Sequence, residues 1–186
     1  MIAFLSVFHI EYKEYNRGAV YLGYFLTPAT VCLAIPLYKQ LELLRQHLIA
    51  VASAIVAGVA GSVGSIYVMC RFFQLEHTHY VTLLPKSITT AIGMGVSEEA
   101  GGIVTLTVIS IIITGILGNI IADWLFQIFK IEEPIAKGLA LGTAAHAIGT
   151  AKALELGEIE GAMSSLSIAV AGLLTVVVVP LMSGLI

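Results

Sequence analysis

A lysine, Lys86, interrupts the apolar segment His77–Ser97 and has the chemistry to bind an anion. A charge at the centre of a bilayer costs about 2.5–3.5 kcal/mol, so a lysine at that depth usually faces a partner or a cavity. Three hydroxyl side chains follow it: Ser87, Thr89 and Thr90. Together with the positive end of a half-helix, these groups suit the carboxylate of a small substrate. The alternative is a lysine that extends from a helix end to the membrane surface.

A second segment, Pro134–Leu156, carries a histidine with comparable potential. His146 lies within the string GTAAHAIGT, where its companions are Thr143 and Thr150. An imidazole can hydrogen-bond a substrate, and because it titrates near neutral pH it also permits proton coupling. The alternative is a buried histidine whose ring is satisfied by a backbone carbonyl. Lys152 is a further candidate cation, although a helix-end anchor is the simpler interpretation.

Acidic residues follow both segments: Glu98, Glu99, Glu158 and Glu160. They could pair with the lysines, or carry a coupling proton if burial raises their pKa. For Glu98 and Glu99 we leave open whether they couple protons or are solvated helix ends. Glu158 and Glu160 are interpreted as solvated helix ends.

His77 and His79 form a His-x-His pair, which is one element of a metal site. Because only Glu76 stands beside them, a surface loop is the preferred interpretation, and we predict no metal and no cofactor. The sequence contains none of the motifs H-E-x-x-H, G-x-S-x-G or G-x-x-x-x-G-K-[ST]. We therefore predict that the protein is not an enzyme.

The composition is that of a chain dissolved in lipid. Of the 186 residues, 11% are charged and 58% are hydrophobic. Nine Lys and Arg with twelve Asp and Glu are too few to give a soluble domain its polar surface. The net charge of −3 leaves no electrostatic footprint for nucleic acid. The partner that the composition predicts is therefore the lipid bilayer.

Four uncharged stretches are long enough to cross a bilayer as helices: Gly18–Tyr38, Gln46–Cys70, Ala100–Ala122 and Gly161–Ile186. Between them, the two segments with Lys86 and His146 are rich in Gly, Thr and Pro. Backbone broken at membrane depth is tolerated where protein or a watery cavity surrounds it. We predict an all-α polytopic membrane protein with about four full transmembrane helices and two broken or re-entrant segments lining a substrate site. The alternative for these segments is interfacial loops or ordinary kinked spans.

Sequence similarity between the two segments indicates an internal repeat. Ser87–Gly93 reads SITTAIG and Thr143–Gly149 reads TAAHAIG, and the Ala-Ile-Gly triplets are 56 residues apart. Broken helices at corresponding positions of a repeat are typical of transporters. Chance similarity between strings rich in Ala, Gly and Ile is the alternative.

Small residues recur at helical spacing in two of the long stretches. They are Ala57, Gly61 and Ser65 in the first stretch, and Gly115 and Gly118 in the other. Such positions let helix backbones approach closely in lipid, so we expect them to pack against neighbouring helices.

Three strings in this chain are long and specific: TPATVCLAIPLYKQ (Thr27–Gln40), LLPKSITTAIGMGVSEEAGG (Leu83–Gly102) and KGLALGTAAHAIGTAKALELGEIEGAMSSL (Lys137–Leu166). They closely resemble the LrgB/CidB family of bacterial membrane proteins. The resemblance runs from about Glu11 to the C-terminus and implies a single membrane domain over residues 1–186. Family members usually carry another apolar span before the loop that reads EYKEY here, so we expect that this chain lacks it.

The resemblance implies two functions. The first is secondary transport of a small monocarboxylate of the pyruvate, glycolate and glycerate class, as in a plastid relative, with the substrate clasped between Lys86–Thr90 and Thr143–Thr150. The second is holin- or antiholin-like regulation of murein hydrolase activity and autolysis with a small LrgA/CidA-type partner. Either function implies a bacterial cell membrane and a homo- or hetero-oligomer.

Overall fold

The computed structural model describes residues 17–18, 20–21, 24, 28, 32 and 34–186. The chain divides into two compact units, Met1–Ile35 and Pro36–Ile186. The described residues of the first unit are mostly helical. The predicted span Gly18–Tyr38 lies largely outside the described residues, and the EYKEY loop lies wholly outside them.

Three long helices of the second unit have the length and apolar composition of membrane spans. They are α6 (Leu48–Phe72), α9 (Val104–Ile128) and α11 (Glu158–Ser183). They coincide with the last three of the predicted stretches. Two short helices, α4 (Ala34–Lys39) and α5 (Leu41–Gln46), precede α6. In the part of the chain that the structure describes, all regular structure is helical, which confirms the predicted fold class.

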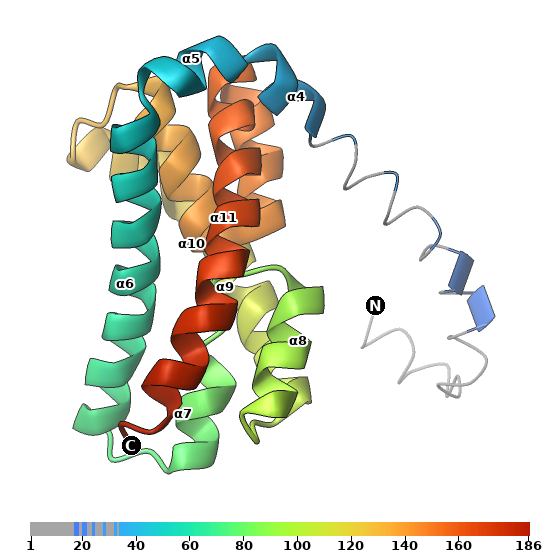
Figure 1. Ribbon diagram of the computed structural model, residues 1–186, viewed down its shortest axis with the longest axis vertical. Helices are drawn as coiled ribbons and strands as arrows, with labels where there is room; N and C mark the ends of the chain where they lie inside the picture. The colour runs from blue at the N-terminus through green and yellow to red at the C-terminus, as the bar shows by residue number, and fades with distance from the viewer. Residues whose placement is uncertain (1–16, 19, 22–23, 25–27, 29–31, 33) are drawn as a thin grey trace. The chain divides into compact units, whose positions relative to one another are not determined.

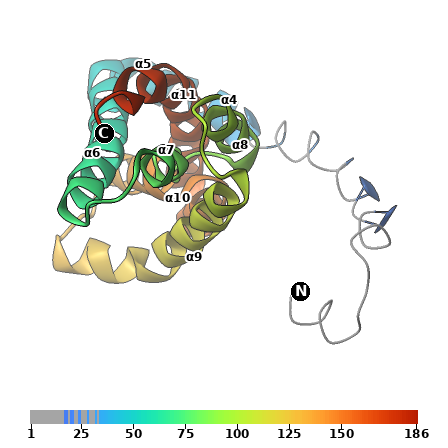
Figure 2. The same cartoon turned by 90° about the horizontal axis from the view of Figure 1, so that it is seen from below.

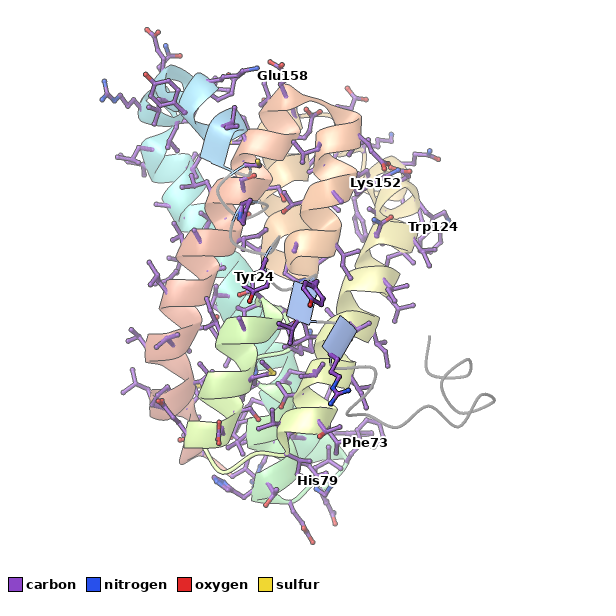
Figure 3. All side chains as sticks on the ribbon, turned by 90° about the vertical axis from the view of Figure 1, so that its right-hand side faces the viewer. Tyr24, Phe73, His79, Trp124, Lys152 and Glu158 are labelled. Atoms are coloured by element: carbon purple, nitrogen blue, oxygen red, sulfur yellow. The ribbon has the colours of Figure 1, made fainter. Side chains whose placement is uncertain are left out.

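The three spans alternate in direction (Figure 1). We call the end that carries α5 and the start of α11 the upper end, and the end that carries the α6–α7 loop and the C-terminus the lower end. At the upper end, Lys39 Nζ lies 3.6 Å from a carboxylate oxygen of Glu158. At the lower end, His77 Nδ1 lies 2.8 Å from the carbonyl oxygen of Ile186. Lys152 and Glu158 thus lie toward one end, with Phe73 and His79 at the other (Figure 3).

The segment with Lys86 is a helical hairpin that enters from the lower end. Helix α7 (His77–Leu83) leads to a tight turn that contains Pro85, and α8 (Thr90–Glu99) returns. Proline suits this turn because it lacks the backbone N–H that a continuing helix needs. We call His77–Glu99 hairpin 1. Seen from the lower end, α7 lies between α6 and α9 (Figure 2).

The segment with His146 is a second hairpin, which enters from the upper end. Helix α10 (Pro134–Leu156) breaks at His146, where φ is 42° and ψ is −133°. A Cβ added to Gly149 would lie 3.1 Å from the carbonyl carbon of Leu141, eight residues earlier. In a continuous helix eight residues span about 12 Å, so the two arms, 134–145 and 147–156, fold back on each other. We call Pro134–Leu156 hairpin 2. Both segments are therefore re-entrant, as predicted.

Hairpin 2 packs tightly on α11 through glycine. Added Cβ atoms would lie 2.9 Å from Met163 Cβ at Gly138 and 2.9 Å from Ser164 Cα at Gly142. Small residues allow such close backbone approach where lipid supplies no hydrophobic drive for helix association. The second arm is joined to α9 by the ion pair of Lys152 Nζ with Asp123 Oδ2 at 2.8 Å.

The buried apolar core lies between α6, hairpin 1 and α11. It includes one face of α6 together with large side chains from the other elements: Val51, Ile55, Val59, Val63, Ile66, Tyr80, Leu84, Met163 and Val179. Most of α9, by contrast, exposes isoleucine and leucine, for example Ile112, Ile116 and Ile120. An apolar exposed surface is what a lipid-facing helix requires.

The predicted small-residue contacts are found on α9 but not on α6. Added Cβ atoms at Gly115 and Gly118 would meet His146 and Ala145 of hairpin 2, which confirms their packing role. Nothing lies within 4 Å of a Cβ added at Gly61. On α6 the close approach is instead at Gly58, whose added Cβ would lie 2.9 Å from Thr143 Oγ1.

Gly149→Ala tests the folded-back geometry of hairpin 2. The new methyl group would press on the first arm, and we expect it to lower the free energy of unfolding by about 1–3 kcal/mol, as overpacking does. The measurement is the midpoint of thermal unfolding of the detergent-purified protein. Gly64→Ala is the matched control, because nothing lies within 4 Å of its added Cβ. Equal midpoints for the two variants would contradict the hairpin.

Candidate functional site

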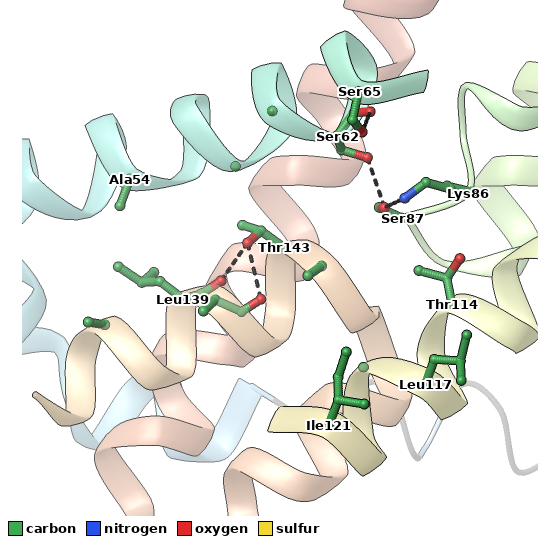
Figure 4. Close-up of a pocket in the computed structure, with 16 residues that line it drawn as sticks. Ala54, Ser62, Ser65, Lys86, Ser87, Thr114, Leu117, Ile121, Leu139 and Thr143 are labelled. Atoms are coloured by element: carbon green, nitrogen blue, oxygen red, sulfur yellow. Dashed lines mark hydrogen bonds between the residues drawn. The ribbon is translucent and has the colours of Figure 1, made fainter. Parts of the chain in front are cut away.

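A cavity of about 700 Å³ lies between α6, α9 and the first arm of hairpin 2. Its lining runs along residues 54–65 of α6, 114–121 of α9 and 136–144 of α10, and Lys86 and Ser87 from the tip of hairpin 1 close its lower side (Figure 4). Most of the lining side chains are small or apolar. The cavity therefore runs from the first turn of α10, toward the upper end, to the tip of hairpin 1 near the middle of the unit.

Lys86 is the charged group of this cavity. Its Nζ donates to Ser87 Oγ at 3.1 Å, and Ser62 Oγ donates to the same oxygen at 2.8 Å. Ser62 is the fifteenth of the 25 residues of α6, about 15 Å along the helix from its lower end. Lys86 thus lies deep in the unit rather than at a helix end near the surface. Among the described residues no carboxylate pairs with it.

Ser87 and Thr143 meet the cavity from the two hairpins. Ser87 is 7% exposed and Thr143 is 8% exposed, so each is nearly buried yet reaches the cavity wall. Thr143 Oγ1 donates to the Leu139 carbonyl at 2.7 Å, which leaves its lone pairs toward Gly58 and the cavity. Both side chains also line a narrow pocket that continues toward Thr175 of α11. The structure therefore brings together Lys86, Ser87 and Thr143 of the predicted site.

Ser62 is a site residue that the sequence analysis missed. It comes from α6, outside both predicted segments, and binds the tip of hairpin 1 through Ser87. The signal that could have found it is a serine in the middle of a membrane span on the same face as Gly58 and Ser65, which also line the cavity.

The other predicted hydroxyl residues do not line the cavity. Thr89 and Thr90 are half-buried where α8 begins, and Thr89 has an extended backbone with φ −62° and ψ 142°. Thr150 is fully buried and bonds the His146 carbonyl at 3.0 Å and Ser164 Oγ at 2.7 Å. Thr150 thus satisfies the backbone of the broken helix and joins it to α11.

His146 faces α9 rather than the cavity. It is 4% exposed, its Nε2 lies 2.9 Å from the Ile111 carbonyl oxygen, and its ring packs against Gly115. This is the geometry of a buried histidine whose ring is satisfied by a backbone carbonyl, the alternative to a substrate-binding role. A substrate or proton-coupling role for His146 stays a prediction.

The acidic residues lie at the ends of the unit, away from Lys86. Glu98 and Glu99 are exposed at the end of α8, on the lower side. Glu158 pairs with Lys39, and Lys152 pairs with Asp123, a partner that the sequence analysis did not consider. Among the described residues no group of three or more His, Cys, Asp or Glu side chains could hold a metal ion.

The arrangement suits a single negative charge. In the described part of the chain, 16 residues line the cavity, and they include one cation and no carboxylate, together with the hydroxyl groups of Ser62, Ser65, Ser87, Thr114 and Thr143. A carboxylate is the ordinary partner of a desolvated ammonium group, and the hydroxyls can donate to or accept from a neighbouring oxygen of a small ligand.

Comparison with known proteins identifies the family of this chain. The model of the LrgB-like family matches residues 1–185. Over 180 residues, 97% of this chain and 78% of the relative, the chain is 41% identical to the antiholin-like protein LrgB of Bacillus mycoides. It is 40% identical, with the same coverage, to the proteins of that name in Bacillus cereus and Bacillus anthracis. No solved structure matches. The chain therefore belongs to the LrgB-like family.

Proposed function

We propose that this protein is a secondary carrier for small monocarboxylates of the pyruvate, glycolate and glycerate class. The observation that carries the proposal is Lys86, a cation at the tip of a re-entrant hairpin, in a cavity whose described lining residues include no carboxylate. Broken helices that meet deep in the membrane are the usual setting of substrate sites in secondary carriers. Neither this function nor the second candidate below is enzymatic.

Charge pairing explains why the cavity favours a monoanion. Placing a lysine at the membrane centre costs about 2.5–3.5 kcal/mol, and an anion that pairs with it offsets part of that cost. Among the described side chains, the ammonium group is bonded to Ser87 Oγ alone. A substrate carboxylate would take over as the stronger, charge-assisted acceptor. A second carboxylate on the same substrate would meet no second cation among the described lining residues.

The proposal includes coupling to protons, as predicted from His146, Glu98 and Glu99. Of these, His146 contacts a helix that lines the cavity: its ring packs against Gly115 of α9, whose neighbour Thr114 is a lining residue. Glu98 and Glu99 are exposed at the lower end, so we assign the coupling role to His146.

A second candidate function is holin- or antiholin-like regulation of murein hydrolase activity and autolysis. The relatives in three Bacillus species are named antiholin-like proteins, and these names favour the second candidate over transport. In this proposal the protein works in a bacterial cell membrane with a small LrgA/CidA-type partner, and the exposed apolar faces of α6 and α9 contact lipid or that partner.

Lys86→Ala tests the carrier function. Because a hydrogen bond to a charged group contributes about 1.5–3 kcal/mol, we expect uptake of labelled pyruvate at low concentration to fall roughly tenfold or more. Uptake is measured in proteoliposomes with and without a pH gradient and with and without the LrgA/CidA-type partner. Lys137→Ala, on the first arm of hairpin 2 but outside the cavity lining, is the matched control and should transport normally.

The outcomes separate the two candidates. If the wild-type protein takes up no monocarboxylate, alone or with the partner, the carrier proposal is wrong. If the Lys86→Ala variant abolishes uptake yet restores normal autolysis in a strain that lacks the gene for this protein, the regulation of autolysis does not depend on monocarboxylate transport through this site. Normal uptake by Lys86→Ala would show that Lys86 does not bind the substrate, and the carrier function itself would stand.

Ser62→Ala tests the contribution of α6. Loss of its hydrogen bond to Ser87 removes about 0.5–1.5 kcal/mol of support for the hairpin tip, so we expect a two- to tenfold rise in the apparent KM. Ser53→Ala on the exposed side of the same helix is the control, because its hydroxyl bonds only the Ala50 carbonyl. An unchanged KM in Ser62→Ala would show that the tip is held without this bond.

A further inference from the structure

The two hairpins correspond position by position at an offset of 56 residues. A Cβ added at Gly93 of hairpin 1 would lie 3.5 Å from the Pro85 carbonyl oxygen, eight residues earlier. At the equivalent Gly149 of hairpin 2, the added Cβ would contact the carbonyl of Leu141, again eight residues earlier. The same Ala-Ile-Gly glycine thus lets the returning arm approach the same carbonyl in both hairpins.

The breaks and the next helices correspond as well. Hairpin 1 resumes helix at Thr90 and hairpin 2 resumes after His146, its equivalent. Each returning arm is also bonded to the span that follows it, although the bonded residues are not equivalent at the 56-residue offset. The bonds are Thr107 Oγ1 to Ser97 Oγ at 2.6 Å in the first half, and Thr150 Oγ1 with Ser164 Oγ at 2.7 Å in the second.

The halves are inverted relative to each other. Hairpin 1 enters from the lower end and leads into α9, which runs upward, whereas hairpin 2 enters from the upper end and leads into α11, which runs downward (Figure 1). Repeats of this kind are related by a pseudo-two-fold axis in the membrane plane, and substrate sites lie near that axis. The equivalent residues Ser87 and Thr143 line the same cavity and the same narrow pocket, so the axis passes between them.

The symmetry is broken on the first arms. In hairpin 2, Ala136, Ala140 and Ala144 are exposed and line the cavity. Their equivalents in hairpin 1 are Tyr80, Leu84 and Ile88, which are only 0%, 1% and 3% exposed. Tyr80 Oη also donates to the Met182 carbonyl of α11 at 3.0 Å. The same surface is therefore open in one half and closed in the other.

We propose that the protein alternates between two conformations, and that the hairpin that is open in one conformation is closed in the other. This proposal rests on the proposed carrier function. In the conformation that the structure shows, the cavity extends from Lys86 to Ala136, the third residue of α10, and gives access from the upper end. In the other, the face of hairpin 1 formed by Tyr80, Leu84 and Ile88 separates from α6 and α11 and lines a pathway from the lower end. The alanine face of hairpin 2 closes at the same time. Lys86 and Ser87, beside the axis, serve both conformations.

Paired cysteine substitutions test this exchange. In a background of Cys32→Ser and Cys70→Ala, we compare Ala144→Cys with its equivalent Ile88→Cys, using a membrane-impermeant maleimide applied to one side of oriented vesicles. Glu132→Cys in the α9–α10 loop marks the upper side and His79→Cys marks the lower side. Val56→Cys, exposed on α6 outside the cavity, controls for lipid-facing positions and should stay unlabelled.

The expected result is labelling of Ala144→Cys from the upper side and of Ile88→Cys from the lower side. In the double variant Ala144→Cys/Ile88→Cys, a maleimide already attached at position 144 should hold the cavity open. Labelling of position 88 from the lower side should then be at least fivefold slower. If both positions are labelled from the upper side, or Ile88→Cys is never labelled while vesicles take up substrate, the exchange is wrong. Ala140→Cys with Leu84→Cys is the second pair, in case Ile88→Cys fails to fold.

Parallel uptake measurements keep the two proposals distinguishable. Two-sided labelling without monocarboxylate uptake would support the exchange and contradict the substrate class. Monocarboxylate uptake with one-sided labelling would support the carrier function and overturn the exchange.

Discussion

The structure depends on one constraint: every backbone polar group in the membrane must be satisfied within the protein. A continuous helix meets this requirement by itself, whereas the two hairpins break at depth and leave carbonyl and N–H groups without helical partners. Neighbouring side chains and helices supply the partners. Thr82 accepts from the Ile103 N–H at 2.8 Å, Thr107 donates to the Thr82 carbonyl at 2.9 Å, and Thr150 donates to the His146 carbonyl at 3.0 Å.

This constraint divides the polar residues of the hairpins into two groups. Thr82, Thr107 and Thr150 satisfy backbone at the breaks or the foot of α9, and the His146 ring bonds the Ile111 carbonyl in the same way. Ile111 also packs its side chain against Gly93 of hairpin 1, so this part of α9 touches both hairpins. A second group faces the cavity instead: Lys86, Ser87 and Thr143 of the hairpins, together with Ser62 of α6.

The sequence predicts the elements better than the contacts between them. Long uncharged stretches identify α6, α9 and α11. Pro85 marks the break of hairpin 1, and Gly142 and Gly149 flank the break of hairpin 2, so these signals are local. Contacts such as that of Gly149 with Leu141 decide whether the chain folds back at a break, and the local sequence does not reveal these contacts. The same holds for Ser62, which reaches the tip of hairpin 1 from another helix, and for Asp123, which pairs with Lys152. His146 lies at a break, and the neighbouring sequence does not predict which helix its ring faces.

The two hairpins differ at the position of the charged residue: hairpin 1 has a lysine there and hairpin 2 does not. The position equivalent to Lys86 in hairpin 2 is Gly142, and an added Cβ there would lie 2.9 Å from Ser164 Cα of α11. Hairpin 2 therefore has no room for a second lysine, because its first arm needs glycine to pack against α11. A second cation near the axis would also repel the first in a medium of low dielectric constant. In the proposed exchange, one lysine beside the pseudo-two-fold axis is enough for a monoanionic substrate, since the same group would remain at the centre whichever hairpin is open.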